Sequence, residues 1–427
     1  MRSFILKMHR LVIHIKKNTG WVSLFLFVMA SGTLHGQQAF TVYNTGNSLL
    51  PDNSVGGIAI DSMGRKWVGT GYGLAVYNDT TWTVYQTINS GLSHNSVVSI
   101  VFDAMGIAWI GTQYGGLNKF DGTNWTVFNT LNSGITSDFI RGIGIDSLGN
   151  KWICTDNGLN KFNDTTWTVF NTMNSGIPAD HIACIAIENN NLRWLGSVNG
   201  GFVMMEDTTF TVYTIANSGF PDNTILGIQI DTIGIKWMVC PSGALVRYYS
   251  GLFSSYNTGN SLIPTNSLDA MDIDSLQDIY MGSFDKGIVK KEGSNYYSYN
   301  TLNSGMPDDL VASVTVEKNG IIWAGTSAFG LVRFEEALFV GVPELFTSPP
   351  VVIYPNPVKQ VLNVASKESV QSIKIIDLAG SVKYEQKNSN LNSRTFHLDV
   401  SHLSAGMYFL YLNTGTKNVS KRFIKVE

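Results

Sequence analysis

The sequence predicts an all-β protein in which a seven-bladed β-propeller precedes a C-terminal immunoglobulin-like β-sandwich. The first observation is an aromatic residue that recurs at steps of 42 or 43 residues, at Trp67, Trp109, Trp152, Trp194, Trp237, Tyr280 and Trp323. The second is an asparagine ladder with the same steps, at Asn47, Asn89, Asn132, Asn174, Asn217, Asn260 and Asn303. The third is a break after Phe334, where short alternating strands replace the repeats. A period of ~40–45 residues with about four strand-like runs per unit is typical of propeller blades.

Each repeat has the pattern of four short antiparallel strands. In the second repeat the strands are expected at residues 97–103, 108–112, 117–120 and 125–128. The segments between them contain Asp, Asn and Gly, which favour tight turns because Gly adopts positive φ without a steric penalty. A loop over residues 129–138 then leads to the next blade. Four strands joined by such turns form one blade.

The N-terminal strand is expected to close the ring. A fourth-strand motif recurs through the chain, and its first copy, Phe40-Thr-Val-Tyr43, precedes the first complete repeat. The last repeat ends at Leu331-Val-Arg-Phe334 with no such strand after it. Residues 40–43 should therefore complete the seventh blade, since an open ring would leave blade edges unpaired. We expect the repeated Trp and the Gly beside it to pack between neighbouring blades, because they recur around the whole ring.

The three cysteines, Cys154, Cys184 and Cys240, lie in three different repeats. An odd and scattered set of this kind matches neither a disulfide framework nor a metal site. We therefore expect the three side chains to act as small buried apolar groups, which is the usual environment of a free cysteine.

The N-terminus has the pattern of a secretory signal peptide. Basic residues precede a ten-residue apolar run from Trp21 to Ala30, and small residues follow towards Gly36. The alternative, a membrane anchor, needs about 20 apolar residues. We expect a removed signal peptide at residues 1–36, a propeller at 37–336, a linker at 337–350 and a second domain at 351–427. No membrane span is expected in the mature chain.

Charge is divided unevenly along the sequence. The whole chain has 29 basic and 32 acidic residues. Residues 1–36 hold 5 basic and no acidic residues, and residues 344–427 hold 10 basic and 6 acidic, which leaves the repeats 14 basic and 26 acidic and a net charge of −12. A negative propeller repels polyanions at long range. Nucleic acid is therefore not an expected partner, and heavily sulfated glycans are disfavoured.

Over residues 40–336 the repeats resemble the two-component regulator propeller family. The motif that carries this resemblance runs from Asp103 to Leu117 and reads Asp-x-x-Gly-x-x-Trp-Ile-Gly-Thr-x-x-Gly-Gly-Leu. In that family such propellers form periplasmic sensor regions of hybrid histidine kinases, often tuned to carbohydrates. The sequence shows no second propeller, transmembrane helix or kinase segment. The resemblance therefore implies the fold and a binding habit rather than the sensor role.

The C-terminal segment resembles the type A C-terminal sorting domain of the type IX secretion system. The motifs are Tyr354-Pro-Asn-Pro357, Ile375-Ile-Asp-Leu-Ala-Gly380, Leu403-Ser-Ala-Gly-Met-Tyr408 and the closing Lys421-Arg-Phe-Ile-Lys-Val426. The resemblance implies export by the type IX machinery, which is the expected partner, and then cleavage of the domain. The mature protein would be secreted or attached to the outer cell surface. The alternative is an accessory sandwich without a role in export.

No convincing motif for catalysis, a metal or a cofactor is found. His94 and His181 are the histidines of the repeats, and neither has a Cys, Ser or Glu partner at a telling spacing. The sequence lacks a Gly-Lys-Ser/Thr phosphate loop and a His-Glu-x-x-His zinc motif. Its Asp-x-x-Gly turns lack the alternating oxygen ligands of a calcium loop. We therefore expect no catalytic residue, no metal and no cofactor.

If the fourth strand of each blade is outermost, two sets of loops share one face near the axis, where propellers commonly bind ligands. The loop between the second and third strands offers Tyr72, Tyr114, Asn157, Asn199, Ser242, Phe284, Asp285 and Phe329. The loop that enters each blade offers His94, Asp138, Asp180, His181, Asp222, Asp308 and Asp309. Aromatic faces beside carboxylates and amides suit neutral sugars, because rings stack and polar groups bind hydroxyls. The alternative is a wet polar face without a ligand.

Nine of these residues are the candidate ligand-binding set: Tyr72, Tyr114, Asn157, Asn199, Phe284, Asp285, Phe329, Asp180 and His181. The favoured function is a secreted or surface-displayed binding propeller without catalysis, whose partner is a neutral glycan or a surface protein. A polysaccharide lyase or hydrolase that uses acids such as Asp180 and Asp308 is one alternative. A structural or adhesion module without a small ligand is another.

Overall fold

The computed structural model describes residues 13–17, 20–24, 39–189, 191–242, 244–339, 344–346, 351–366, 370–378, 380–387, 395–413 and 418–426. The N-terminal unit, residues 1–38, contains an antiparallel hairpin of β1 (Ile13–Lys17) and β2 (Gly20–Leu24). The rest of the predicted signal peptide, residues 1–36, lies outside the described residues. In the described part of the chain, no helix has the length and apolar character that a membrane crossing requires.

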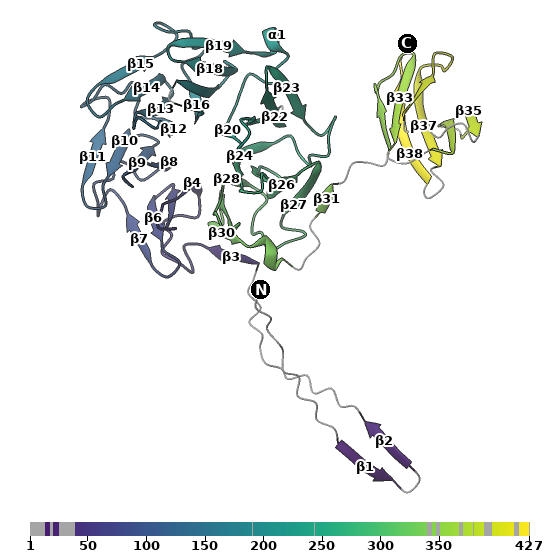
Figure 1. Ribbon diagram of the computed structural model, residues 1–427, viewed down its shortest axis with the longest axis horizontal. Coiled ribbons are helices and arrows are strands. Elements are labelled where there is room, and N and C mark those ends of the chain that lie inside the picture. Colours follow the sequence, from purple (N-terminus) through teal and green to yellow (C-terminus); the bar gives the residue numbers. More distant parts are fainter. Residues whose placement is uncertain are drawn as a thin grey trace. The chain divides into compact units, whose positions relative to one another are not determined.

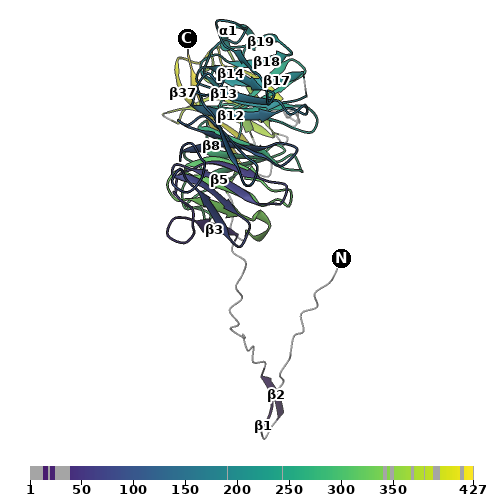
Figure 2. The ribbon, with the colours of Figure 1, turned by 90° about the vertical axis from the view of Figure 1, so that its left-hand side faces the viewer.

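Seven antiparallel sheets follow one another around a central axis and form a β-propeller (Figure 1). The first strand of each blade is innermost: these strands contact one another from blade to blade, and β28 of the last blade contacts β4 of the first. Figure 2, turned by 90°, shows the ring edge-on. The prediction of an all-β protein with a seven-bladed propeller is confirmed.

The first four blades contain these strands. Blade 1 has β4 (Val55–Ile60), β5 (Lys66–Thr70), β6 (Gly73–Tyr77) and β7 (Trp82–Tyr85). Blade 2 has β8 (Val97–Phe102), β9 (Ala108–Thr112), β10 (Leu117–Phe120) and β11 (Trp125–Phe128). Blade 3 has β12 (Ile140–Ile145), β13 (Lys151–Thr155), β14 (Gly158–Phe162) and β15 (Trp167–Phe170). Blade 4 has β16 (Ile182–Ile187), β17 (Leu192–Ser197), β18 (Phe202–Glu206) and β19 (Thr209–Tyr213).

The last three blades complete the ring. Blade 5 has β20 (Gly227–Ile230), β21 (Lys236–Cys240), β22 (Ala244–Tyr249) and β23 (Leu252–Tyr256). Blade 6 has β24 (Leu268–Ile273), β25 (Ile279–Ser283), β26 (Ile288–Glu292) and β27 (Asn295–Tyr299). Blade 7 has β28 (Val311–Val316), β29 (Ile322–Thr326), β30 (Leu331–Phe334) and β3 (Phe40–Tyr43). A helical turn, α1 (Ile215–Ser218), precedes blade 5, and a 3-10 turn, η1 (Glu336–Leu338), follows β30.

The N-terminal strand closes the ring, as predicted. β3 pairs antiparallel with β30, with Phe40 opposite Phe334 and Tyr43 opposite Leu331. The rings of Phe40 and Phe334 stack with their centroids 4.2 Å apart. Blade 7 is therefore built from both ends of the repeat region. With β3 as its outer strand, this blade has four strands.

The repeated tryptophans pack between blades, as predicted. Trp67 of blade 1 lies in one apolar cluster with Ile100 and Phe120 of blade 2. Gly69, two residues after this Trp, permits the close approach. A Cβ atom at Gly69 would lie 2.7 Å from the carbonyl oxygen of Val97 in the next blade. A larger residue there would push the two blades apart, because no side chain tolerates so short a contact with backbone.

The recurring Asn closes the loop between consecutive blades. The Oδ1 atom of Asn132 accepts a hydrogen bond from the N–H of Asn129 (2.9 Å), and its Nδ2 atom donates to the carbonyl oxygen of Val127 (3.0 Å). The equivalent pair of bonds occurs in the other six repeats. The ladder therefore has a structural cause, since one amide group satisfies a backbone donor and a backbone acceptor.

The C-terminal domain is a sandwich of two sheets with the orders β32–β33–β36 and β35–β34–β37–β38. The strands are β32 (Val351–Tyr354), β33 (Val361–Ser366), β34 (Ser372–Asp377), β35 (Val382–Lys387), β36 (Thr395–Asp399), β37 (Gly406–Asn413) and β38 (Asn418–Lys425). Leu362 and Leu398 of the first sheet share one buried cluster with Ile373, Leu410 and Phe423 of the second. The predicted sandwich is confirmed.

Part of the segment predicted as a linker forms a strand. Residues 337–350 contain β31 (Glu344–Phe346), which pairs antiparallel with β27 of blade 6. In this pairing Phe346 lies opposite Tyr296, and Glu344 lies opposite Ser298. β31 thus adds a fifth strand to the outer edge of blade 6 and covers backbone groups that an edge strand would leave unpaired.

The three cysteines are free thiols, as predicted. Burial raises the pKa of Cys184 to about 12 and holds the pKa of Cys154 and of Cys240 well above the ordinary value. The thiolate is the reactive form of cysteine, and these groups remain protonated at neutral pH. They therefore act as packing groups rather than as nucleophiles.

Candidate functional site

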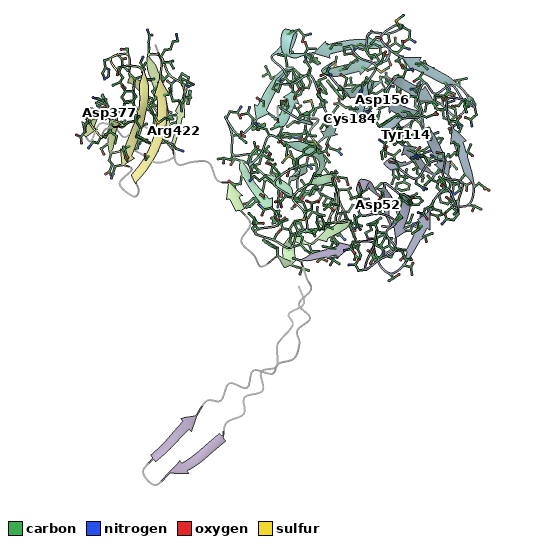
Figure 3. The ribbon with its side chains drawn as sticks, turned by 180° about the vertical axis from the view of Figure 1, so that it is seen from behind. Asp52, Tyr114, Asp156, Cys184, Asp377 and Arg422 are labelled. Atoms are coloured by element: carbon green, nitrogen blue, oxygen red, sulfur yellow. The ribbon has the colours of Figure 1, made fainter. Side chains whose placement is uncertain are left out.

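Two sets of loops share one face of the propeller, as predicted. The N–H of Gly71, between the second and third strands of blade 1, donates to the carbonyl oxygen of Ser54 in the loop that enters this blade (3.1 Å). Figure 3 shows three labelled residues of these loops, Asp52, Tyr114 and Asp156, around the central opening. We call this side the mouth face.

Four exposed aromatic side chains form an arc on the mouth face. Tyr72, Tyr114, Phe284 and Phe329 are 62, 62, 46 and 50% exposed. They belong to blades 1, 2, 6 and 7, which are consecutive because the ring is closed. The same loops of blades 3, 4 and 5 carry Asn157, Asn199 and Ser242. The mouth face therefore has an aromatic half and a polar half.

The loop backbone does not require these rings. The N–H groups of Tyr72 and Phe329 donate to the hydroxyls of Thr70 (3.2 Å) and Thr326 (2.9 Å). Both bonds use only main-chain atoms of the aromatic residues. The rings themselves remain in water, which costs solvation free energy that a stacked ligand would recover.

Tyr114 begins a chain of contacts that leads towards the axis. Its ring lies edge-on to His94 (5.4 Å between centroids) and to Phe139 (5.6 Å). The guanidinium carbon of Arg141 lies 4.5 Å from the centroid of Phe139. The N–H of Ser96 donates to Nδ1 of His94 (3.0 Å), so the neutral form of this histidine carries its proton on Nε2. His94 therefore offers a donor beside an exposed ring.

Arg141 continues this chain as part of a trio with Asp156 and His181. Its Nε atom donates to Oδ1 of Asp156 (2.5 Å). Nε2 of His181 lies 3.3 Å from the same oxygen, without the geometry of a hydrogen bond. Burial lowers the pKa of His181, the charge of Arg141 lowers it further, and Asp156 offsets this only in part. His181 is therefore neutral at pH 7 and lies beside a carboxylate.

A central cavity of about 480 Å³ is lined by the first strands of the blades, including Gly56, Val98, Arg141, Leu226, Asp269 and Ala312. Arg141 and Asp269 occupy equivalent positions in blades 3 and 6. Burial raises the pKa of Asp269 to about 6, and no hydrogen-bond partner for its carboxyl is found among the described residues. The cavity therefore contains one acidic group that loses its charge close to physiological pH.

The acidic residues predicted at the mouth face stabilise the turns of their own loops. Asp180 accepts hydrogen bonds from the N–H of Thr172 (2.7 Å) and from its hydroxyl (3.1 Å). Asp or Asn makes the same main-chain bond in all seven repeats. Asp308 accepts a hydrogen bond from the N–H of Leu310 (3.1 Å). These carboxylates serve the fold of the loops, which argues against Asp180 as a ligand-binding group.

The remaining candidates are distributed around the ring. Asn157 is exposed and donates through Nδ2 to the carbonyl oxygen of Thr136 (3.2 Å), and no donor to its Oδ1 is found among the described residues. Asn199 is also exposed and has a positive φ of 63°. Asp285 is exposed beside Phe284 on blade 6. The structure thus joins Tyr114 and His181 in one cluster over blades 2 to 4 and places the other aromatic candidates on blades 6, 7 and 1.

Sequence reasoning missed Phe139, Arg141, Asp156 and Asp269. Alignment of the repeats contains a signal for two of them. At the position of Arg141 and Asp269, the other five repeats have Gly56, Val98, Ala183, Leu226 and Ala312, so a charged residue is an exception. The contacts of Asp156 depend on its neighbours in space and have no such signal.

The comparison with protein families decides the role of the C-terminal domain. Residues 352–426 match the family described as the secretion system C-terminal sorting domain. This stretch is a sorting domain. The protein is therefore secreted or displayed at the outer cell surface, and its C-terminal domain interacts with the secretion machinery. No curated protein matches the sequence significantly.

Solved structures with a similar fold include the extracellular domain of BT3049, described as a hybrid two-component system from B. thetaiotaomicron. It has a TM-score of 0.62 and 18% identity, and the alignment covers 91% of this chain and 57% of that one. PorZ, described as a surface component of the type-IX secretion system of Porphyromonas gingivalis, has a TM-score of 0.59 and 16% identity over 96% of this chain and 62% of its own. The chain thus spans about three fifths of these two relatives.

A third neighbour is an enzyme. Virginiamycin B lyase from Staphylococcus aureus, solved with quinupristin, has a TM-score of 0.56 and 15% identity, and covers 69% of this chain and 98% of its own. At these identities the three neighbours establish the propeller fold and leave activity and ligand to the chemistry of the site.

Proposed function

We propose that this exported propeller binds a neutral glycan on its mouth face without transforming it. The observation that supports this most is the arc of four exposed rings on consecutive blades, Phe284, Phe329, Tyr72 and Tyr114. Exposed aromatic residues that are grouped on one face are typical of binding surfaces, whereas single exposed apolar residues need no explanation. The rings thus mark where a ligand would lie.

Sugars suit this surface by shape and by charge. Their C–H faces stack on aromatic rings, and their hydroxyls pair with carboxylates, amides and imidazoles. Such groups border the arc: Asp285 follows Phe284, Nε2 of His94 lies beside Tyr114, and Oδ1 of Asn157 is on the next blade. The repeat region has a net charge of −12, which favours a neutral ligand over an anionic one.

A hydrolase is less well supported. Such an enzyme needs two carboxylic acids across the scissile bond, one of which is free to give or take a proton. The acids named for this role, Asp180 and Asp308, accept hydrogen bonds from their own turns. Each carboxylate is therefore held by the fold of its loop rather than presented to a substrate.

A lyase is the second candidate, and one observation favours it. Neutral His181 lies 3.3 Å from the carboxylate of Asp156, beside Arg141. A neutral imidazole suits the abstraction of a proton, and a guanidinium can stabilise the negative charge that results. The lyase from Staphylococcus aureus is described as catalytically inactive after a histidine is replaced. The lyase hypothesis predicts loss of turnover in His181→Ala.

A glycan array probed with the full-length chain tests the proposal. Binding to neutral glycans is expected, and the double variant Tyr72→Ala/Tyr114→Ala should bind about thirtyfold more weakly if each ring contributes about 1 kcal/mol. Tyr249→Ala is the matched control, because Tyr249 is also an exposed tyrosine (44%) but lies at the opposite face, at the end of β22. Its affinity should equal that of the wild type.

Three outcomes would reject the proposal. Absence of binding to any neutral glycan at millimolar concentration would favour a structural module. An unfolded double variant with an intact control would assign the rings to packing. Release of a shorter or unsaturated product, lost in His181→Ala, would favour the lyase.

A further inference from the structure

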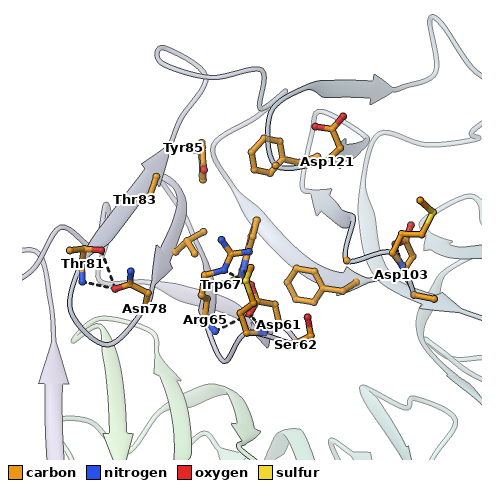
Figure 4. Close-up of a pocket in the computed structure, with 18 residues that line it drawn as sticks. Asp61, Ser62, Arg65, Trp67, Asn78, Thr81, Thr83, Tyr85, Asp103 and Asp121 are labelled. Atoms are coloured by element: carbon orange, nitrogen blue, oxygen red, sulfur yellow. Dashed lines mark hydrogen bonds and ion pairs between the residues drawn. The ribbon is translucent and has the colours of Figure 1, made fainter.

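A second cavity, of about 710 Å³, lies between blades 1 and 2 on the side opposite the mouth face (Figure 4). Its walls combine aromatic rings and acids: Trp67, Tyr85, Phe102, Phe120, Asp61, Asp103 and Asp121. The rings belong to strands of the two blades, and the acids belong to the turns between first and second strands and between third and fourth strands. None of these residues belongs to the mouth face. The cavity is therefore independent of the proposed glycan site.

The other seams of the propeller show what occupies the equivalent space. In four of them the residue before the repeated Trp is a cation that lies over the Trp of the preceding blade. The distances from cation to ring centroid are 5.1 Å for Lys66 and Trp323, 4.4 Å for Lys151 and Trp109, 4.0 Å for Arg193 and Trp152, and 4.7 Å for Lys236 and Trp194. A cation over a ring face is attracted by the ring's negative face.

In the seam between blades 7 and 1, carboxylates hold the cation from two sides. Nζ of Lys66 lies 2.6 Å from Oδ1 of Asp79, in a turn of its own blade, and 3.1 Å from Oε1 of Glu317 in the preceding blade. Glu317 also accepts the indole N–H of Trp323 (2.6 Å). Three groups together therefore bind this buried ammonium. They are the Trp ring beneath it, the acid that also accepts the indole N–H of that ring, and an acid from the lysine's own blade.

The seam between blades 1 and 2 lacks two of these parts. Ala108 stands where blade 1 has Lys66, and Gly122 stands where it has Asp79. The preceding blade still supplies its share, because the indole N–H of Trp67 donates to Oδ2 of Asp61 (2.9 Å). The space that a lysine and its partner fill elsewhere is part of the cavity, which Gly122 lines.

The cavity also has the right charge for a cation. Asp61, Asp103 and Asp121 face one cationic residue, Arg65, among its lining residues. Burial opposes the ionisation of Asp61, but hydrogen bonds from Trp67 and Arg65 outweigh it and hold the pKa below its usual value. Hydrogen bonds from the backbone of Asn124 and Thr123 lower the pKa of Asp121.

Arg65 competes for part of this site. Its Nε atom lies 2.6 Å from Oδ2 of Asp61, and its guanidinium carbon lies 5.6 Å from the centroid of Trp67 (Figure 4). The Arg65 side chain is 37% exposed, whereas that of Lys66 in its seam is 3% exposed. Arg65 therefore covers Asp61 from the solvent side and does not fill the cavity as Lys66 fills its own.

We propose that this seam cavity binds a primary alkylammonium group, which takes the place of the lysine absent from blade 2. The ammonium lies over Trp67 and pairs with Asp61, as Lys66 does with Trp323 and Glu317. The unbranched alkyl arm lies between Tyr85, Phe102 and Phe120. The same chemistry is offered by a lysine side chain of another protein and by a free aliphatic amine.

Saturation-transfer NMR on the full-length chain tests this with three probes: n-pentylammonium, Nα-acetyl-lysine N-methylamide and 1-pentanol. Both cations should bind, and the neutral alcohol should not. Tighter binding of the blocked lysine would identify a protein side chain as the source, and tighter binding of the free amine would identify a small molecule. Equal binding of 1-pentanol would overturn the proposal, because the cavity would then select only apolar groups.

Two variants restore the missing parts and should have opposite effects. Ala108→Lys supplies the cation from within and should weaken amine binding about tenfold or more. Gly122→Asp supplies the carboxylate and should tighten binding about tenfold. Gly122 has a φ of 97° with nothing within 4 Å of a Cβ atom, and Asp79 and Asp164 adopt positive φ at the same place in their turns. The fold therefore accepts this change.

Two further variants test amine binding even if Ala108→Lys does not fold. Arg65→Ala removes the competing cation and should tighten amine binding. Lys151→Ala empties the seam between blades 2 and 3, where Lys151 pairs with Asp164 (2.5 Å). This variant should have a second amine site and a lower melting temperature. Addition of n-pentylammonium should restore the melting temperature. Unchanged amine binding in Arg65→Ala and Gly122→Asp, or no rescue of Lys151→Ala, would contradict the proposal.

Discussion

Asp269 faces the central cavity without a hydrogen-bond partner among the described residues, and its contribution to stability should depend on pH. Its ordinary pKa of 3.8 rises to about 6 in the folded protein because of burial. The folded protein holds the proton more tightly than the unfolded chain. Below about pH 4, Asp269 is protonated in both states and does not change the free energy of unfolding. Between about pH 4 and 6 its ionisation lowers the free energy of unfolding progressively, and above about pH 6 the full loss of stability is present.

Asp269→Asn should consequently stabilise the protein at pH 7.5 by about 2 kcal/mol, and the gain should disappear towards pH 4. Urea unfolding at a series of pH values measures this. Asp285→Asn is the matched control, since it makes the same chemical change at an exposed position of the same blade. A constant difference between Asp269→Asn and wild type over this range would contradict the assignment.

The recurring asparagine is expected to stabilise the turn in which it lies. Asn132→Ala removes two hydrogen bonds to backbone groups and should lower the free energy of unfolding by about 1–3 kcal/mol. Leu131→Ala, at the adjacent and 94% exposed position, should have almost no effect. Chemical denaturation of the two variants compares them directly. Equal stabilities would mean that the asparagine is not needed for the turn.

At the scale of elements, closure of the ring by β3 is the feature with the largest expected effect. Deletion of residues 37–44 removes the pairing of β3 with β30 and the stack of Phe40 on Phe334, and exposes an edge strand. The melting temperature should fall by several degrees or the protein should aggregate, relative to a chain that lacks residues 1–36 only. Equal melting temperatures of the two chains would contradict closure by this strand.

Repetition explains which elements could be predicted from the sequence. The Trp ladder, the Asn turns and the closing strand were predicted correctly because each recurs in several repeats and so has a cause common to all blades. β31 was missed, since its three residues lie in a proline-containing segment and pair with β27 only through tertiary contact. At the mouth face, the positions of the loops follow from the repeat, and the rings could be identified as departures from it. The trio of Arg141, Asp156 and His181 instead depends on side chains that meet across two blades.

At the scale of the whole molecule, export should depend on an intact C-terminal sandwich. Phe423 on β38 is fully buried in the core shared by the two sheets, and Ile424 beside it is 40% exposed. Phe423→Ala, like deletion of residues 421–427, should retain the protein in the periplasm of a host with the secretion system, whereas Ile424→Ala should be exported. Immunodetection in cell fractions distinguishes them, and normal export of Phe423→Ala would show that the folded sandwich is not required.

The propeller is thus a repeated scaffold, and the two proposed sites depend on residues that depart from the repeat. These are four exposed rings and the trio of Arg141, Asp156 and His181 at the mouth face, and Ala108 and Gly122 in place of a lysine and its acid at the seam between blades 1 and 2. Hydrogen–deuterium exchange of the full-length chain, with and without a neutral glycan that it binds, tests the central claim about the mouth most directly. Protection is expected at residues 70–73, 112–116, 283–287 and 326–330, and not in the turns of the opposite face. Protection confined to the opposite face, or unchanged exchange in these four loops, would contradict it.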